Sequence, residues 1–205
     1  VAYLLPILQL VLRGHPEQGG RPAQPLAVVL APTRELASQI AGEASWLVAG
    51  MPVHVAAIYG GVPYRASRDA LRAGADVLVA TPGRLEDACV RGDVVLRQVK
   101  GAVLDEADRM LDLGFEEQIR VLLTRRMPRT GGGRQTAMFS ATFGSGVQHL
   151  AADFLDAYTF VAVGRVGGAA KTVEQRLIWV EDAKKPQALL GSLLALESGS
   201  TGPCS

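Results

Sequence analysis

Short apolar runs alternate with helical periodicity along most of this chain, and that alternation limits the folds it can adopt. Each run is either rich in β-branched residues or continuously apolar, and each ends in turn-forming residues, as strands do. The predicted strands are residues 26–31, 53–59, 76–80, 101–104, 136–139 and 159–163. Their continuous apolar character indicates strands that are covered on both faces.

Helical stripes lie between these strands. Apolar residues recur at helical spacing in segments 36–47, 115–123 and 147–155, and such a stripe predicts a helix packed on a core. Repeated strand–helix alternation predicts an α/β fold in which helices cover both faces of a parallel sheet. Right-handed crossovers place the strand-to-helix turns at the carboxyl edge of such a sheet. We therefore expect the functional residues in those turns.

The charge balance, the cysteines and the histidines narrow the classes of function. The formal net charge is +1, so nucleic-acid binding depends on local cations rather than on a global positive field. Cys89 and Cys204 lie far apart and indicate two free thiols in a reducing compartment. His15, His54 and His149 share no ligand-like spacing, which argues against a metal cage made by the protein.

The apolar run at the beginning of the chain, residues 1–12, does not have the pattern of a signal peptide or a membrane span. It lacks a basic leader and a small-residue cleavage pattern. It is also too short to cross a bilayer, and Pro6 interrupts it. We expect a buried helix whose beginning has been cut off, in a soluble intracellular protein.

The pattern changes near Gly164. Residues 165–172 are predicted to form an interdomain linker because they are rich in glycine and other small residues. A predicted strand at 173–180 and a predicted helix at 183–196 follow, and two such elements cannot bury their apolar faces alone. We therefore expect a first domain over residues 1–164 and, over residues 173–205, the opening of a second domain.

Three predicted turns share one design, in which a strand ends in hydroxyl residues just before a helix. They occupy residues 31–36, 80–84 and 139–142. Thr33 and Thr81 suit the N-cap position, and Pro82 suits the first helical position. Free amides at such a helix start, with Arg34 or Arg84 beside them, form an anion site that could hold successive phosphates of one strand. The alternative is ordinary helix capping with surface arginines.

A glycine pair, Gly60 and Gly61, follows the strand that ends at Tyr59. Glycine lacks a side chain, so another backbone can approach closely at this point. The alternative is that the pair only forms a turn.

An acidic turn, Asp105-Glu106-Ala107-Asp108, follows the apolar strand at 101–104. Nucleoside triphosphatases use carboxylates at a strand end to hold Mg²⁺ and to prepare a water molecule. Asp105 would face the metal through water, and Glu106 would orient or deprotonate the attacking water. Carboxylates this close repel one another, so a cation partner is expected. The alternative is a solvated acidic turn that caps the next helix.

Five segments, taken in order, resemble the motif series of DEAD-box ATP-dependent RNA helicases. They are Pro32-Thr33-Arg34-Glu35-Leu36, Gly60-Gly61, Thr81-Pro82-Gly83-Arg84, Asp105-Glu106-Ala107-Asp108 and Ser140-Ala141-Thr142. Residues 104–112, 138–143 and 160–167 are similar to the eukaryotic branch that contains Vasa and its translation-initiation relatives. The resemblance implies a RecA-like parallel sheet of the P-loop NTPase type, followed by the start of a second RecA-like lobe.

The resemblance also implies roles for these residues, with ATP and Mg²⁺ as cofactors. Asp105 and Glu106 would serve ATP hydrolysis, with Asp105 holding Mg²⁺ through water. Asp108, Ser140 and Thr142 would couple the nucleotide site to the RNA site. The backbone of single-stranded RNA or of a short RNA duplex would be held by Pro32, Thr33, Arg34, Gly60, Gly61, Thr81, Gly83 and Arg84. Such backbone contacts are indifferent to sequence.

The chain also departs from the family pattern. Residues 1–8 resemble the helix after the family's phosphate-binding loop, but the loop itself, the adenine-reading segment and most of the second lobe are not in the sequence. Gly144 stands where relatives often have proline. We therefore expect a helicase fragment that is inactive alone. The alternatives are a non-catalytic RNA- or protein-binding module and a two-lobed translocase that acts on DNA.

The resemblance leads to expectations about partners and location as well. Proteins of ribonucleoprotein (RNP) particles are candidate partners, and no membrane partner is expected. The expected location is the cytoplasm, with RNP granules as a candidate site and the nucleus left open.

Overall fold

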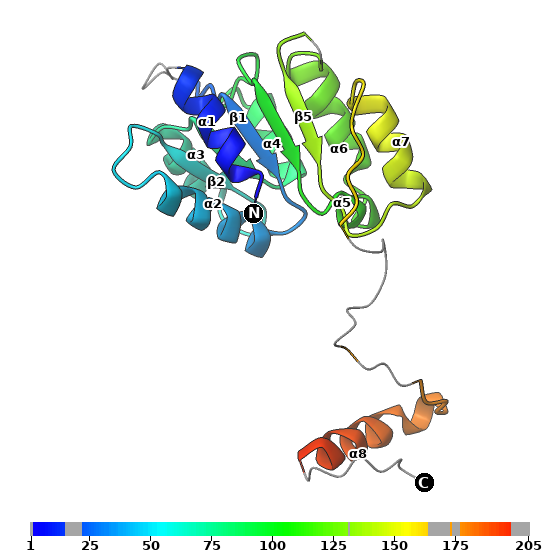
Figure 1. The fold of residues 1–205 in the computed structure, drawn as a ribbon. Coiled ribbons are helices and arrows are strands. Elements are labelled where there is room, and N and C mark those ends of the chain that lie inside the picture. The colour runs from blue at the N-terminus through cyan, green and yellow to red at the C-terminus, as the bar shows by residue number, and fades with distance from the viewer. Residues whose placement is uncertain (1, 15–21, 131, 164–172, 174–176, 198–205) are drawn as a thin grey trace. The chain divides into compact units, whose positions relative to one another are not determined.

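The computed structural model describes residues 2–14, 22–130, 132–163, 173 and 177–197 of the chain (Figure 1). The chain divides into two compact units, Val1–Gly167 and Gly168–Ser205. The predicted linker at 165–172 lies outside the described residues.

A five-stranded parallel sheet forms the centre of the first unit (Figure 1). Its strands are β1 Ala27–Leu30, β2 Val55–Ile58, β3 Val77–Ala80, β4 Gly101–Leu104 and β5 Gln135–Met138, in the order β2-β3-β1-β4-β5. Every residue of β1, β3 and β4 is buried, as expected from their continuous apolar sequences. Five of the six predicted strands and the predicted α/β parallel-sheet fold are therefore confirmed.

The sixth predicted strand, residues 159–163, is wrong. This segment pairs with no strand among the described residues, and Val163 is 97% exposed. A groove of about 900 Å³, lined by β5 and by the segment itself, separates the two. An apolar, β-branched sequence becomes a strand only where a neighbouring backbone accepts its hydrogen bonds, and no described strand pairs with this segment.

Two helices cover one face of the sheet, α1 Leu4–Gly14 and α2 Arg34–Leu47. They pack against alternate residues of the strands, such as Ala27 and Val29 of β1. The predicted N-terminal helix is confirmed, with Leu4, Ile7, Leu8 and Val11 buried. Pro6 does not interrupt it, because proline is tolerated in the first turn of a helix, where no intrahelical N–H bond is needed.

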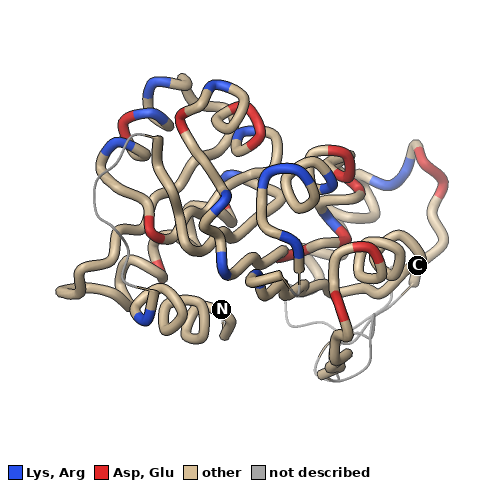
Figure 2. The backbone as a smooth tube through the Cα atoms, turned by 90° about the horizontal axis from the view of Figure 1, so that it is seen from above, with Lys and Arg blue, Asp and Glu red and all other residues tan. Residues whose placement is uncertain are grey.

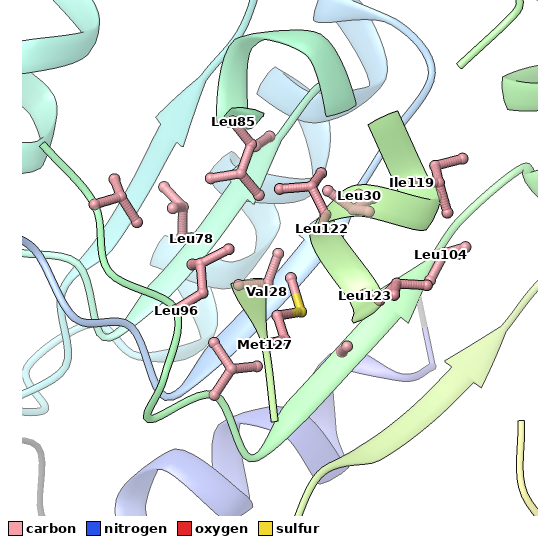
Figure 3. Close-up of a cluster of buried hydrophobic side chains, with 14 of the residues drawn as sticks. Val28, Leu30, Leu78, Leu85, Leu96, Leu104, Ile119, Leu122, Leu123 and Met127 are labelled. Carbon is pink, nitrogen blue, oxygen red and sulfur yellow. The ribbon is translucent and has the colours of Figure 1, made fainter. Parts of the chain in front are cut away.

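The opposite face carries α3 Tyr64–Arg72, α4 Pro82–Val90, α5 Ala107–Asp112, α6 Glu116–Val121 with a following π-turn Leu122–Arg126, and α7 Ser145–Phe154. Val28 and Leu30 of β1 point to this face, where they meet Leu85, Ile119 and Leu122 in a continuous apolar layer (Figure 3). All four residues of the 115–123 stripe and most of the 147–155 stripe face this core, as predicted.

The second unit contains a 3₁₀ turn, Asp182–Lys184, and the helix α8 Lys185–Glu197. The helix predicted at 183–196 is therefore present. The strand predicted at 173–180 is not observed at residue 173 or at 177–180, and residues 174–176 lie outside the described part. Leu189, Leu190 and Leu193 of α8 are each more than half exposed.

Two further expectations concern the membrane and the thiols. In the described ranges, no helix combines the length and the apolar character needed to cross a bilayer. Cys89 is a free thiol on α4, and its burial raises its pKa to about 11. A thiol with a raised pKa carries little thiolate at neutral pH and is a weak nucleophile. Cys204 and His15 lie outside the described residues.

Candidate functional site

The turn after β1 begins α2 and carries an exposed arginine. Thr33 is the N-cap residue, and its Oγ1 accepts a hydrogen bond from the Leu36 amide at 3.2 Å, as predicted. Pro32 is buried, whereas Arg34 is exposed at the first helical position. The Arg34 guanidinium lies over the Tyr59 ring at 5.6 Å, so the end of β2 helps to direct it.

The turn after β2 contains the glycine pair. A Cβ added to Gly60 or Gly61 would meet no atom of the chain within 4 Å. Gly61 has a φ of +76°, a conformation that residues with side chains rarely adopt. The pair therefore leaves an open surface beside the backbone. The positive φ explains why residue 61 is glycine, but the backbone conformation does not require glycine at residue 60.

The turn after β3 begins α4. Thr81 is the N-cap residue and Pro82 the first helical residue, both as predicted, but the Thr81 side chain makes no capping hydrogen bond. Arg84 is half-buried, and its Nη1 and Nη2 donate to Ser67 Oγ at 2.8 Å and to the Val62 carbonyl at 2.9 Å. Arg84 therefore holds the start of α3 and the loop after the glycine pair, which is more than a surface arginine does.

Gly83 lies between these two residues in the first turn of α4, half-buried. We call the three turns with Pro32–Arg34, Gly60–Gly61 and Thr81–Arg84 the cationic turns, since each is lined or held by an arginine. All three follow the carboxyl ends of neighbouring parallel strands, so they lie along one edge of the sheet.

The acidic turn follows β4. The Asp105 amide continues the ladder by donating to the Leu30 carbonyl at 2.9 Å. Both carboxylate oxygens of Asp105 are engaged: Oδ2 accepts from the Tyr3 hydroxyl at 2.6 Å, and Oδ1 accepts from the Glu106 amide at 3.0 Å. The side chain is thereby held in one orientation at the end of the strand.

Glu106 has the left-handed backbone conformation, with φ 52° and ψ 54°. This conformation is uncommon and costly for a residue other than glycine, and such residues cluster at functional sites. Its carboxylate has no hydrogen-bond or ion-pair partner in the part of the chain that the structure describes. Glu106 is thus the acid of this turn that is left available to a ligand or a water molecule.

Asp108 joins the acidic turn to the turn after β5. Its Oδ2 accepts from the Thr142 amide at 3.0 Å and from the Thr142 hydroxyl at 2.7 Å. Burial opposes ionisation of this carboxyl, but hydrogen bonds from the side chains of Thr142 and Ser140, and from backbone amides, outweigh it and lower the pKa of Asp108. The structure thus brings Asp108 together with two residues of the turn after β5, which lie more than thirty positions further along the chain.

Tyr3 is the residue of this region that the sequence pattern did not single out. Its ring is 5.0 Å from that of Phe139 at the end of β5, and its hydroxyl reaches Asp105 from 102 positions away. Burial first, and then the Asp105 carboxylate, raise the pKa of Tyr3 well above its usual range. Tyr3 directly precedes α1, and nothing in the apolar sequence of residues 1–12 distinguished it from a core residue.

The acid groups fit an Mg²⁺ ion bound mainly through water. Among the described residues no cluster of three or more His, Cys, Asp or Glu side chains forms a protein cage. Mg²⁺ does not need one, because it keeps several waters and uses one or two carboxylates. The Asp105 carboxylate, fixed at the end of β4, supplies one, and the free Glu106 carboxylate beside it remains available to a water molecule.

Cations and anions are interspersed over the elements of the chain (Figure 2), in keeping with the net charge of +1. The carboxyl edge of the sheet therefore has no large basic face. What marks it is the placement of single charged residues at its turns. The fold and this edge define a RecA-like α/β domain, with its functional turns outside the carboxyl ends of parallel strands.

Comparison with known proteins names the family. The family described as DEAD/DEAH box helicase matches residues 1–150. The crystal structure of the yeast DEAD-box splicing factor Prp28 is similar, with a TM-score of 0.71 and 31% sequence identity over 95% of this chain and 45% of that one. A hypothetical ATP-dependent RNA helicase from Sulfolobus tokodaii gives a TM-score of 0.65 and 34% identity over 77% of this chain and 42% of that one.

This chain belongs to the DEAD/DEAH box helicase family. It spans less than half the length of the two solved structures, so it corresponds to one part of such a protein.

Proposed function

We propose that this chain serves as the first RecA-like lobe of an ATP-dependent RNA helicase. In this proposal ATP hydrolysis at the acidic turn is coupled to the holding of single-stranded RNA, or of a short RNA duplex, at the cationic turns. One observation carries the proposal: both sets of turns lie on one edge of one sheet, and Asp108 of the acidic turn is bonded to Thr142 of the next turn.

The acidic turn is suited to water activation. Mg²⁺ bound with ATP would supply electrostatic stabilisation of the phosphoryl group. Asp105, held by Tyr3 and by the Glu106 amide, would hold the metal's water shell in a fixed orientation. Glu106 then orients the attacking water and accepts its proton, because its carboxylate is not committed to another residue in the described part of the chain.

The turn after β5, with Ser140 and Thr142, is suited to coupling. Asp108 accepts two bonds from Thr142, so a shift of α5 at the acidic turn moves the start of the segment that leads into α7. Such a hydrogen-bonded link can shift the equilibrium between two arrangements of neighbouring elements. We assign Asp108, Ser140 and Thr142 to this positioning role.

The cationic turns are suited to holding a phosphate backbone. The free amides at the starts of α2 and α4 favour anions, and the exposed Arg34 adds a charge that binds phosphate. The open surface at Gly60 and Gly61 lets a sugar-phosphate chain approach. Arg84 fixes the loop beside this surface through its hydrogen bonds to Ser67 and Val62. Contacts of this kind hold RNA without reading its sequence.

Membership in the Vasa-like and translation-initiation branch stays part of the proposal, carried by residues 104–112, 138–143 and 160–167. RNP proteins as partners and the cytoplasm as the location are also part of the proposal.

A chimera tests the proposal. Residues 1–163 of this chain replace the matching region of a two-lobed DEAD-box helicase, and ATP hydrolysis is measured with and without poly-U RNA. We expect hydrolysis that RNA stimulates. A folded chimera that hydrolyses ATP only with DNA would favour a DNA translocase instead.

A second candidate function is a non-catalytic RNA-binding module. It is favoured by the engagement of both Asp105 oxygens within the chain, which leaves Glu106 as the free acid of the pair. A chimera that binds poly-U but hydrolyses no ATP would support this candidate.

A further inference from the structure

Tyr59 follows the last residue of β2 and connects two of the cationic turns. Side chains alternate along a strand, so Tyr59 points to the same face of the sheet as Val55, the face that α1 and α2 cover. Arg34 begins α2 on that face, and its guanidinium lies 5.6 Å from the centre of the Tyr59 ring. Because β3 lies between β2 and β1 in the sheet, this contact joins turns of strands that are not paired with each other.

The Tyr59 ring is the contact that holds Arg34 in place. The guanidinium of this exposed arginine forms no hydrogen bond or ion pair within the described residues. Its place at the start of α2 is unfavourable for a cation, because the positive end of the helix dipole lies there. A free arginine side chain also has many rotamers, and an anion that binds it must restrict them. A contact that limits these rotamers beforehand therefore strengthens anion binding.

A second tyrosine, Tyr64, is engaged differently. Its ring also lies 5.6 Å from a guanidinium, that of Arg84, but Arg84 is already fixed by two hydrogen bonds. The Tyr64 hydroxyl donates to Asp93 at 2.7 Å, whereas the Tyr59 hydroxyl has no hydrogen-bond partner in the part of the chain that the structure describes. Tyr59 thus acts on its neighbours through its ring.

A guanidinium that stacks on a ring remains able to bind phosphate. The ring attracts the charge through its face and takes none of the N–H groups. The edge of the guanidinium can therefore still donate two parallel bonds to phosphate oxygens. Arg34 is the first residue of α2, and Tyr59 directly precedes Gly60, so the amides of the helix start and the open surface of the glycine pair lie beside the stacked pair.

We propose that Tyr59 is a positioning residue for RNA binding, whose ring holds the Arg34 guanidinium where it meets a phosphate of the RNA backbone. This role of Tyr59 rests on the RNA role proposed above for the cationic turns. Because Tyr59 acts through Arg34 on a phosphate, and phosphates are the same in every sequence, loss of the ring weakens the binding of all RNA sequences alike.

Binding of oligouridine and oligoadenosine RNA to the full chain tests this role. Tyr59→Leu keeps an apolar side chain but removes the ring, and it should weaken the binding of both RNAs by about two- to fivefold, the range of one exposed cation–π contact. Tyr59→Phe keeps the ring and should bind both RNAs as the unmodified chain does. Trp46→Leu, which removes an exposed ring from the last turn of α2, is the matched control and should leave binding unchanged.

Two further measurements separate positioning from a general structural effect. In the Arg34→Ala background, Tyr59→Leu should cause no further loss of RNA binding, because the ring then has no guanidinium to hold. NMR of the RNA-free chain gives a measurement that does not depend on affinity. The ring current of Tyr59 should shift the Arg34 Nε–H resonance upfield, and this shift should disappear in Tyr59→Leu and remain in Tyr59→Phe.

The possible results distinguish a failure of the Tyr59 role from a failure of the RNA role. If Arg34→Ala weakens RNA binding but Tyr59→Leu does not, Tyr59 is not a positioning residue. Equal losses on Tyr59→Leu with and without Arg34 would mean a structural effect, and a loss on Tyr59→Phe would mean a direct contact of the hydroxyl. Either result overturns the proposal. If Arg34→Ala does not weaken binding, or the unmodified chain binds neither RNA, the RNA role of the cationic turns is itself wrong and Tyr59 has nothing to position.

Discussion

The cationic turns and the acidic turn are built in the same way but carry opposite charges. Each is a strand end that leads within a few residues into a helix, on one edge of one sheet. In each region charged side chains are fixed within the chain. Arg84 is bonded to Ser67 and Val62, whereas Asp105 and Asp108 accept bonds from Tyr3 and Thr142. In each region another, Arg34 or Glu106, has no ion-pair partner among the residues described.

The charged residues of these turns therefore fall into two groups, those that stabilise the fold and those that are available to a ligand. Charges that are bonded internally hold neighbouring turns together, and their removal should cost stability. Charges without such bonds do little for stability at the surface, so a chain retains them at a conformational or solvation cost only where they meet a ligand. The left-handed backbone of Glu106 is one such cost. The substitutions below test this division, in order of expected effect.

Glu106→Gln should have the largest effect. In the chimera described above, it should slow RNA-stimulated ATP hydrolysis by about 10²–10⁴-fold, since the group that accepts the proton of water is removed. ATP binding should be largely kept, because Asp105 still carries its charge. Glu117→Gln, an exposed acid at the start of α6, is the control and should leave the rate unchanged. A Glu106→Gln chimera with the parent rate would remove Glu106 from the reaction.

Arg34→Ala and Arg84→Ala should differ. Arg34→Ala should weaken poly-U and poly-A binding alike by roughly tenfold, equivalent to ~1.4 kcal/mol. It should also make the salt dependence of binding shallower, by about 0.7 for each RNA phosphate that the arginine no longer neutralises. Arg84→Ala should weaken RNA binding and also lower the melting temperature, because it releases the loop at Val62.

Arg125→Ala is the control for both, as this exposed arginine follows α6 at the opposite edge of the sheet. If Arg34→Ala affects poly-U but not poly-A, the arginine reads bases and the backbone-holding role is wrong.

The positions of these turns could be predicted from the sequence, but their internal bonds could not. Strands β1–β4 follow from continuous apolar runs, and the N-cap position of Thr33 follows from a hydroxyl residue before a helical stripe. Arg84 was predicted to bind phosphate, with a surface arginine as the alternative. Its bonds to Ser67 and Val62 were not predicted, because these partners belong to a different turn. Residues 159–163 have a strand-like sequence, yet they pair with no described strand. Such long-range partners leave no local pattern.

Tyr3→Phe tests whether the acidic turn depends on α1. Removal of the hydroxyl leaves Asp105 Oδ2 without its protein donor and should lower the free energy of unfolding by about 1–2 kcal/mol, measured in urea. Tyr64→Phe, which removes a 2.7 Å bond to Asp93 beside the cationic turns, is the matched control. Only Tyr3→Phe should also slow RNA-stimulated ATP hydrolysis by the chimera, because Asp105 then lacks the bond that fixes Oδ2. A Tyr3→Phe chimera with the parent rate would mean that Tyr3 does not orient this acid.

Thr142→Val should have the smallest effect, and its size should depend on pH. Valine keeps the shape of threonine but removes the hydroxyl bond to Asp108, while the backbone amide still donates. At pH 7 the unfolding free energy should fall by about 0.5–1 kcal/mol, since Asp108 is half-exposed and water replaces part of the bond.

The direction of the pH dependence follows from the lowered pKa of Asp108. A carboxyl with a lower pKa in the folded state adds stability above its unfolded pKa of about 4, and that stability is lost as pH falls through the folded value. The difference between Thr142→Val and the unmodified chain should therefore be constant at neutral pH and shrink in acid. Thr124→Val removes a hydroxyl bond to the Arg120 carbonyl, which does not titrate, so its effect should not vary with pH in this way. If the stability differences of the two variants change in parallel across the acid range, the Thr142 hydroxyl does not stabilise the ionised form of Asp108. Asp108 would then not be a charge that internal bonds hold in place, as they hold Arg84.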